Sequence, residues 1–162
     1  MKIYRLFPLA AALCVAGLLP ASTASAQVAV IVHPSNTTSS VSMDELRSIY
    51  LGRTTLFGKT RIVLISHPEP RTLFDEAVLH MSPTSLKRHW IGMVFSGDGS
   101  VPPRVIEDSE ELKQFVARTP GAIAFLDGRL TDGTVKILRI NGRFPADPAY
   151  PIRPDSASGQ DR

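Results

Sequence analysis

Three short, mostly apolar runs rich in β-branched residues constrain the fold of this chain more than any other feature. They are Val28–Val32, Arg61–Ile65 and Ala122–Leu126. A continuous apolar run of this length is typical of a strand that is covered on both faces, as in a parallel sheet. Segments with the helical period of 3.6 residues lie between the runs. The sequence therefore predicts an α/β domain in three layers, with a mostly parallel sheet flanked by helices.

Four helices are expected from their start and stop signals. The first starts at Ser42, which forms a capping-box pattern with Glu45, and it stops at Gly52. The other three are expected to start at Pro70, Ser82-Pro83 and Ser109, and the last two stop at Gly97 and Pro120-Gly121.

The first helix would link the first two strands in a right-handed strand-helix-strand unit. A fourth strand, Val135–Ile140, has mixed polarity and is expected at an edge of the sheet. Trp90 shares a helical face with Leu86, Met93 and Val94, which predicts packing in the core. The alternative is that Trp90 stacks on a sugar or an aromatic solute.

The first 26 residues have the pattern of a secretory leader. Lys2 and Arg5 precede an apolar run, and Ala24-Ser25-Ala26 forms an A-x-A cleavage site before Gln27. We expect removal of residues 1–26 and a periplasmic or secreted product. No later apolar run is long enough to span a membrane, so no span is expected in the mature chain.

The mature chain of 136 residues is expected to form one domain over residues 27–143. The proline-rich remainder, residues 144–162, shows neither period and is expected to be disordered or draped over the surface. Cys14 leaves with the leader, which excludes a disulfide or a thiolate nucleophile. The 16 basic and 15 acidic residues that remain give no basic run, so no nucleic-acid partner is expected.

The order and spacing of several short motifs support a family resemblance. The motifs are Leu46-x-x-Ile49-Tyr50-Leu51-Gly52, Arg71 with Phe74, Trp90, Phe95-x-Gly97, Pro102-Pro103 and Pro120-Gly121-Ala122-Ile123-Ala124-Phe125. From about Val28 to about Leu126, the chain resembles single-lobe members of the phosphate ABC-transporter solute-binding-like family, which have the type 2 periplasmic binding protein fold. The resemblance implies a non-enzymatic protein with phosphate or another oxyanion as ligand, and an ABC transporter or a sensor as partner.

In two-lobed relatives the anion lies in the cleft between the lobes, partly on backbone N–H groups at a helix start, where the helix dipole favours negative charge. The corresponding turn here is Ser66–Thr72. It departs from the family pattern because Pro68 and Pro70 each remove one N–H donor and Glu69 adds a negative charge. The resemblance therefore implies at most weak binding of an anion, by Ser66, His67, Arg71 and Thr72.

Two of these residues have a structural alternative. Arg71 would either hold the anion or pair with Asp75 at the i, i+4 position. His67 would either add a pH-dependent contact or be a surface histidine of the turn.

A second set of polar residues, Ser35, Asn36 and Thr37, follows the first strand. The carboxyl edge of an open α/β sheet is where ligands usually bind. These residues are therefore candidates for ligand contact, and the alternative is a solvated loop that leads into the Ser42 cap.

No catalytic residue, metal ligand or cofactor is expected. His33, His67, His80 and His89 have no metal-ligand partner at helical spacing, and no serine lies in a nucleophile elbow. Two hypotheses remain. The first is an exported solute-binding-like protein with weak phosphate or oxyanion binding. The second is an interaction module without a ligand that docks on a transporter, on a sensor or on a second copy as a homodimer.

Overall fold

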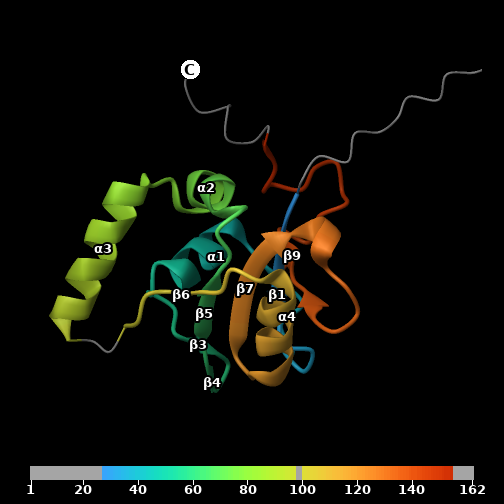
Figure 1. Cartoon of the computed structure of the whole chain (residues 1–162), viewed down its shortest axis with the longest axis horizontal. Coiled ribbons are helices and arrows are strands. Elements are labelled where there is room, and N and C mark those ends of the chain that lie inside the picture. The colour runs from blue at the N-terminus through green and yellow to red at the C-terminus, as the bar shows by residue number, and fades with distance from the viewer. Residues whose placement is uncertain (1–26, 98–99, 155–162) are drawn as a thin grey trace, which may run out of the picture.

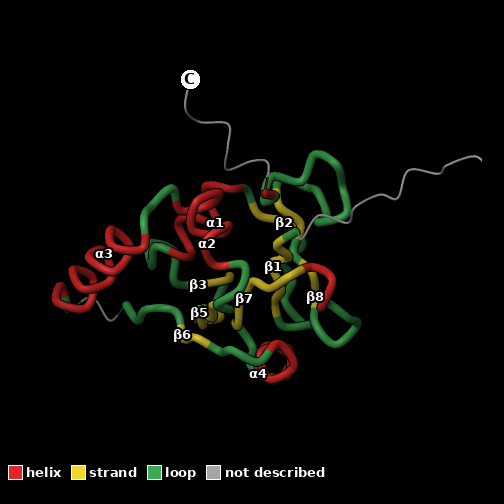
Figure 2. The backbone as a smooth tube through the Cα atoms, turned by 45° about the horizontal axis from the view of Figure 1, so that its top comes forward, coloured by secondary structure: helices red, strands yellow, loops and turns green. Residues whose placement is uncertain are grey.

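The computed structural model describes residues 27–97 and 100–154. The predicted leader (1–26), Asp98-Gly99 and the end of the predicted tail (155–162) lie outside them. Figure 1 shows helices on both sides of a central sheet, with α3 standing at one end of the molecule, and Figure 2 shows the same arrangement after a turn. The elements in chain order are β1 Val28–Val32, β2 Ser40–Val41, α1 Met43–Tyr50, β3 Leu56–Phe57, β4 Thr60–Arg61, β5 Val63–Ser66, α2 Arg71–Phe74, the π-helical segment η1 Asp75–Leu79, α3 Pro83–Ser96, β6 Arg104–Val105, α4 Ser109–Arg118, β7 Ala122–Asp127, the 3-10 turn η2 Gly128–Leu130, β8 Lys136–Ile137 and β9 Arg139–Ile140.

The main sheet has five strands in the order β6-β5-β7-β1-β8. β5 is parallel to β6 and β7, whereas β1 is antiparallel to both β7 and β8. The α/β class is confirmed, but the sheet is mixed rather than mostly parallel. The predicted crossover from β1 through α1 to β5 is also wrong, because β7 lies between them and β1 runs the opposite way. A continuous apolar run indicates that both faces of a strand are buried, but it does not determine the direction in which the strand runs.

Side chains of the central strands alternate between two apolar clusters, which establishes the three layers. In β7, Ile123 and Phe125 face the cluster that contains α1, α2 and α3, while Ala122, Ala124 and Leu126 face the cluster with α4. Figure 1 shows α1 and α4 on opposite sides of the sheet. Burial on both faces explains why the strand sequence contains almost no polar residue.

Local start signals placed the helices well. The Ser42 capping box forms as expected, with the Glu45 N–H donating to Ser42 Oγ at 3.1 Å. Ser82 caps α3, and Gly97 ends it in the left-handed conformation. Two starts differ by one residue, because Pro70 is the N-cap of α2 rather than its first residue, and Asp108 rather than Ser109 caps α4.

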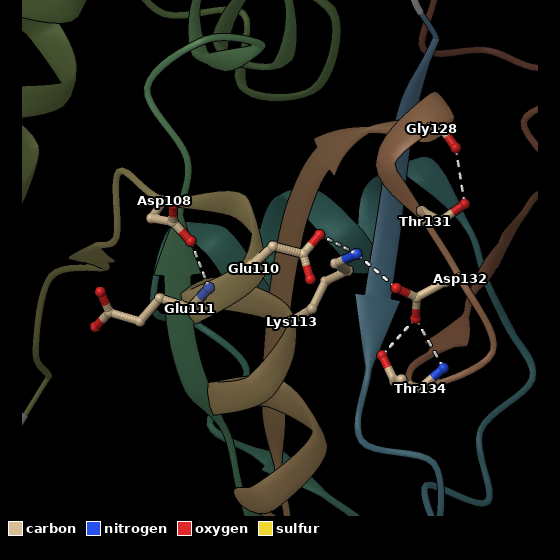
Figure 3. A network of polar contacts seen from close by, with 8 residues as sticks. All are labelled: Asp108, Glu110, Glu111, Lys113, Gly128, Thr131, Asp132 and Thr134. Atoms are coloured by element: carbon tan, nitrogen blue, oxygen red, sulfur yellow. Dashed lines mark hydrogen bonds and ion pairs between the residues drawn. The ribbon is translucent and has the colours of Figure 1, made fainter.

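A network of hydrogen bonds and ion pairs connects α4 to the loop after β7 (Figure 3). Lys113 is buried, and its Nζ lies 2.6 Å from Glu110 Oε1 and 2.5 Å from Asp132 Oδ2. Asp132 also accepts hydrogen bonds from the backbone and hydroxyl of Thr134. The Lys113 and Thr134 hydrogen bonds lower the pKa of Asp132 far below its usual value. The sequence analysis gave no indication of this network.

The chain after β9 returns to the core. Tyr150 and Ile152 are buried and belong to the same cluster as α1 and α3. The predicted fourth strand also divides: β8 forms the expected edge of the main sheet, whereas β9 pairs in parallel with β2. Over residues 144–154, the expectation of a disordered or surface-draped tail is wrong, because two large apolar side chains anchor this segment.

Within the described part of the chain, no helix combines the length and the apolar character that crossing a bilayer requires.

Candidate functional site

The Ser66–Thr72 turn connects the carboxyl end of β5 to α2, as the sequence predicted. Its first two residues are buried, with Ser66 and His67 only 3% and 5% exposed. His67 is therefore not a surface histidine, and its Nδ1 accepts a long hydrogen bond of 3.4 Å from the Glu69 N–H. The Ser66 hydroxyl oxygen is buried and finds no hydrogen-bond partner among the described residues. A buried hydroxyl without a hydrogen-bond partner is energetically costly.

Three aromatic rings hold α2 against the sheet. Phe74 stacks on Phe125 with ring centroids 4.0 Å apart, and Tyr50 meets the edge of Phe74 at 4.7 Å. The Tyr50 hydroxyl donates to the Ile65 carbonyl at 3.1 Å, directly before the turn. Complete burial raises the pKa of Tyr50 well above its ordinary value, so the ring remains a neutral hydrogen-bond donor. These contacts fix Ile65, which precedes the turn, and Phe74, which ends the helix that follows it.

Arg71 forms the ion pair that the structural alternative predicted. Its Nε lies 3.5 Å from Asp75 Oδ2, and the two side chains are 44% and 7% exposed. Burial raises the pKa of Asp75, and the neighbouring Arg71 opposes that rise. Asp75 therefore supplies the negative charge that offsets a cation in the first turn of a helix. An incoming anion would have to compete with this carboxylate for the same guanidinium.

Two carboxylates, Glu69 in the turn and Asp127 at the end of β7, act on the Arg129 guanidinium. Asp127 receives two hydrogen bonds of 3.0 Å from Arg129 Nε, and Asp127 and then Glu69 raise the pKa of the Arg129 guanidinium. Glu69 and Pro70 share with Asp127 and Arg129 a cavity of about 230 Å³. Among the described residues that line this cavity, Arg129 has the only guanidinium, and this group is paired with Asp127. The local charge pattern is therefore unfavourable to a free anion.

The second set of predicted contacts lies at the opposite end of the sheet. Ser35, Asn36 and Thr37 follow β1, and they line a small cavity of about 120 Å³ with residues that include Pro120 and Gly121. Because β1 is antiparallel to β7, its carboxyl end lies beside the amino end of β7 and away from Ser66. The structure therefore does not bring the two candidate sets together. Thr72 is also separate from the buried residues Ser66 and His67, because it is exposed and borders a cavity with His80 and Met81.

The histidines outside the turn have local contacts. His33 Nδ1 accepts from the Ser35 N–H at 3.1 Å, His89 Nε2 lies 3.0 Å from the Leu51 carbonyl, and His80 takes the left-handed conformation after η1. Among residues 27–97 and 100–154, no three His, Cys, Asp or Glu side chains gather as a metal site would require.

Comparison with known proteins identifies the fold. No family model and no curated protein matches the sequence. Solved structures do match. A protein assigned as a phosphate ABC-transporter substrate-binding protein from Clostridium perfringens, solved with bound phosphate, aligns with a TM-score of 0.61 at 19% identity, over 75% of this chain and 48% of that one.

Two further solved structures agree. PstS from Borrelia burgdorferi aligns with a TM-score of 0.63 at 12% identity, over 79% of this chain and 54% of that one. An ABC-type phosphate transport receptor from Vibrio cholerae gives 0.52 at 16% identity, over 75% and 49%. This chain thus spans about half the length of these proteins. It has an α/β fold that matches roughly one lobe of PstS-like proteins, as the family resemblance implied.

One surface was misassigned in the sequence analysis. Leu86 and Trp90 of α3 are buried as predicted, but Val94 is exposed together with Ile91 and Phe95. The spacing of Ile91, Val94 and Phe95 at i, i+3 and i+4 is a second apolar stripe, and the sequence carries this signal. The sequence analysis also missed the local i, i+2 pair of Asp127 with Arg129, and the position of this pair near the turn could not be predicted because it depends on how β7 lies next to β5.

Proposed function

We propose that this chain is an exported, non-enzymatic module of one phosphate-binding-protein-like lobe that works by docking on another protein. The observation that carries the proposal is the state of the Ser66–Thr72 turn. The Arg71 guanidinium of the turn is paired with Asp75. Glu69 adds a carboxylate to the turn, and Pro68 and Pro70 lack N–H donors. The fold is retained while the groups that would hold an anion are engaged or missing. The leader predicted over residues 1–26 would deliver such a module to the periplasm or the medium.

A second candidate, weak binding of phosphate or another oxyanion at the same turn, is favoured by two observations. The Ser66 hydroxyl lacks a partner, and Arg71 remains 44% exposed at the end of a long ion pair. Any affinity would be low, because the anion must displace Asp75.

Thermal-shift titration of the mature protein with phosphate and sulfate separates the two functions. A ligand at one hundred times its dissociation constant adds about 2.7 kcal/mol to the free energy of unfolding. That amount raises the melting midpoint of a domain of this size by several degrees. Docking predicts no shift at millimolar concentration, whereas oxyanion binding predicts a shift.

Two matched variants sharpen this titration. Asp75→Asn releases the Arg71 guanidinium, and Arg71→Ala removes it. If the oxyanion function holds, the first variant binds more tightly than the wild type and the second does not bind. A phosphate shift in the wild type that Arg71→Ala abolishes would replace docking with oxyanion binding as the proposed function.

A further inference from the structure

Helix α3 is fixed to the body of the protein by one face only. Trp90 packs against the end of α1, where its ring is so near Gly52 that a Cβ added there would lie 3.0 Å from the indole Cη2. His89 Nε2 lies 3.0 Å from the Leu51 carbonyl, and Leu86 is buried in the same cluster. Figures 1 and 2 both place α3 at the periphery, with the sheet on its inner side. The orientation of the outer face is therefore set by packing.

This outer face is apolar. Ile91 is 48%, Val94 53% and Phe95 86% exposed. Their i, i+3, i+4 spacing is the anchor pattern of a helix that binds in an apolar groove. The helix has 14 residues, a length of about 21 Å, which suits such a groove. Large apolar side chains grouped on a surface in this way indicate an interaction site.

Among the described residues of α3, the charged side chains beside the stripe are both basic. Lys87 and Arg88 precede it by one helical turn and are exposed. In the sequence, Asp98 is the only carboxylate between Glu76 and Glu107, and it lies outside the described residues. Residues 46–68, which contact α3 at Gly52, also contain no carboxylate. The complementary surface therefore carries negative charge.

We propose that the outer face of α3 is the docking helix of this protein, and that its partner is a protein with an apolar groove rimmed by Asp and Glu side chains. This inference rests on the docking function proposed above and adds the surface and the chemistry of the partner. Ile91, Val94 and Phe95 enter the groove, and Lys87 and Arg88 meet the acidic rim. The apolar anchors supply affinity, and the charges supply orientation and rate of association.

Other occupants fit less well. A second copy that packs α3 against α3 would place Lys87 and Arg88 against a helix that has no carboxylate between Pro83 and Ser96. A negatively charged membrane would attract α3 weakly, because a basic residue near such a surface contributes only about 1 kcal/mol and the helix has two. Both occupants are outcomes of the experiment below.

Site-directed photocrosslinking tests the proposal. The predicted mature chain has no cysteine, so Val94→Cys introduces a unique attachment point for a benzophenone label. Leu130→Cys in η2 is the matched control, since Leu130 is also an exposed apolar residue, at 41%. Each labelled mature protein is added to the envelope and the secreted fraction of the cells that produce it. We expect one protein adduct from position 94 and none from position 130.

Added substitutions test the chemistry of the contact. On the Val94→Cys background, Phe95→Asp should abolish the adduct with no loss of thermal stability, because the ring is exposed in the free protein. Lys87→Glu with Arg88→Glu should also abolish it. In the partner, the Asp and Glu residues that flank the crosslinked peptide are then changed to Lys. This change should restore the adduct with the variant that carries Lys87→Glu and Arg88→Glu.

Each contrary outcome overturns the inference in a recognisable way. An adduct from position 130 but not from 94 rejects this surface and leaves the docking function standing. Absence of adducts at both positions rejects this surface, and the phosphate titration remains an independent test of the docking function. An adduct between two copies of this chain, or flotation with phosphatidylglycerol vesicles that Phe95→Asp abolishes, shows that a different occupant binds α3. Failure of the partner's charge reversal to restore the adduct rejects the acidic rim.

Discussion

Arg71 and Asp75 link the candidate site to the pH dependence of folding. Desolvation raises the pKa of Asp75 above its ordinary 3.8, and Arg71 limits the rise. For a carboxyl whose pKa is raised in the folded state, that state binds more protons than the unfolded chain between the two pKa values. The contribution of Asp75 to stability therefore falls as pH rises through this window.

Removing Arg71 should strengthen this dependence. We expect Arg71→Ala to raise the pKa of Asp75 further and to cost about 1 kcal/mol at neutral pH, a value reduced from that of a fully buried pair because Arg71 is partly exposed. Melting midpoints of the wild type and the variant, measured from pH 4 to pH 7, should diverge as pH rises. In the control Arg71→Ala with Asp75→Asn, the divergence should disappear. If it persists, another group is responsible.

Gly121 allows β4 and β7 to approach one another closely. It has a φ of +85°, and a Cβ built there would lie 2.1 Å from the Arg61 carbonyl oxygen. Gly121→Ala combines the left-handed strain of about 1–2 kcal/mol with a backbone collision, so we expect a larger total loss of stability. Denaturant unfolding measures it. Gly133→Ala, which has open space around its Cβ position, is the control and should change stability far less.

At the residue scale, the sequence predicted the partner of Arg71 but not the burial of His67. An i, i+4 pair depends only on helical geometry, which is local. The burial of His67 depends on which segments cover the turn, and these come from distant parts of the chain. The same reason explains the failure to place Ser35 relative to Ser66, since their separation follows from the antiparallel direction of β1.

Among the elements, α4 depends on a polar connection that has a defined pH signature. Hydrogen bonds from Lys113 and Thr134 lower the pKa of Asp132, so the carboxylate contributes stability above its unfolded pKa, near 3.8. That contribution is lost as pH falls through the lowered value. We expect Lys113→Met, which retains the apolar stem, to lower the melting midpoint at pH 7 and to weaken the decline of stability between pH 5 and pH 2.

The matched control for this network is Glu110→Gln. Glu110 contacts the same ammonium but is two-thirds exposed, so its loss should change the midpoint and its acid dependence less than the loss of Lys113 does. Equal effects of the two substitutions would mean that the connection to Asp132 has no special role.

Element positions were predictable because caps and periodicity are local signals. Ser42, Ser82 and Gly97 fixed three helix ends, and the apolar runs located β1, β5 and β7. Strand direction and partner were not predictable, because hydrogen bonding between strands depends on long-range contacts. The outer stripe of α3 was visible in the sequence, but its exposure required knowledge that nothing in the described part of the chain packs over Phe95.

For the molecule as a whole, the segment after β9 belongs to the core. Ile152 is fully buried, whereas Phe144 is half exposed and lies beside the Arg139 guanidinium. We expect Ile152→Ala to cost about 2–5 kcal/mol, as truncation of a packed aliphatic side chain does. Phe144→Ala should cost about 1 kcal/mol or less, the value of an exposed cation-π contact. Chemical denaturation of both variants checks this, and equal small losses would mean that residues 144–154 only rest on the surface.

The pairing of β1 has a consequence for the time at which this protein can fold. Val28 pairs with Asp127 and Ile31 with Ile137, so the earliest strand in the chain has no sheet neighbour until β7 and β8 have been synthesised. Contacts this distant in sequence slow folding, because a large loop must close first. We therefore expect the sheet of a nascent chain to remain incomplete on the ribosome until β7 and β8 have been synthesised. Under the export proposed above for this chain, that delay would keep the polypeptide unfolded, and so able to pass through a narrow membrane pore, until transport begins.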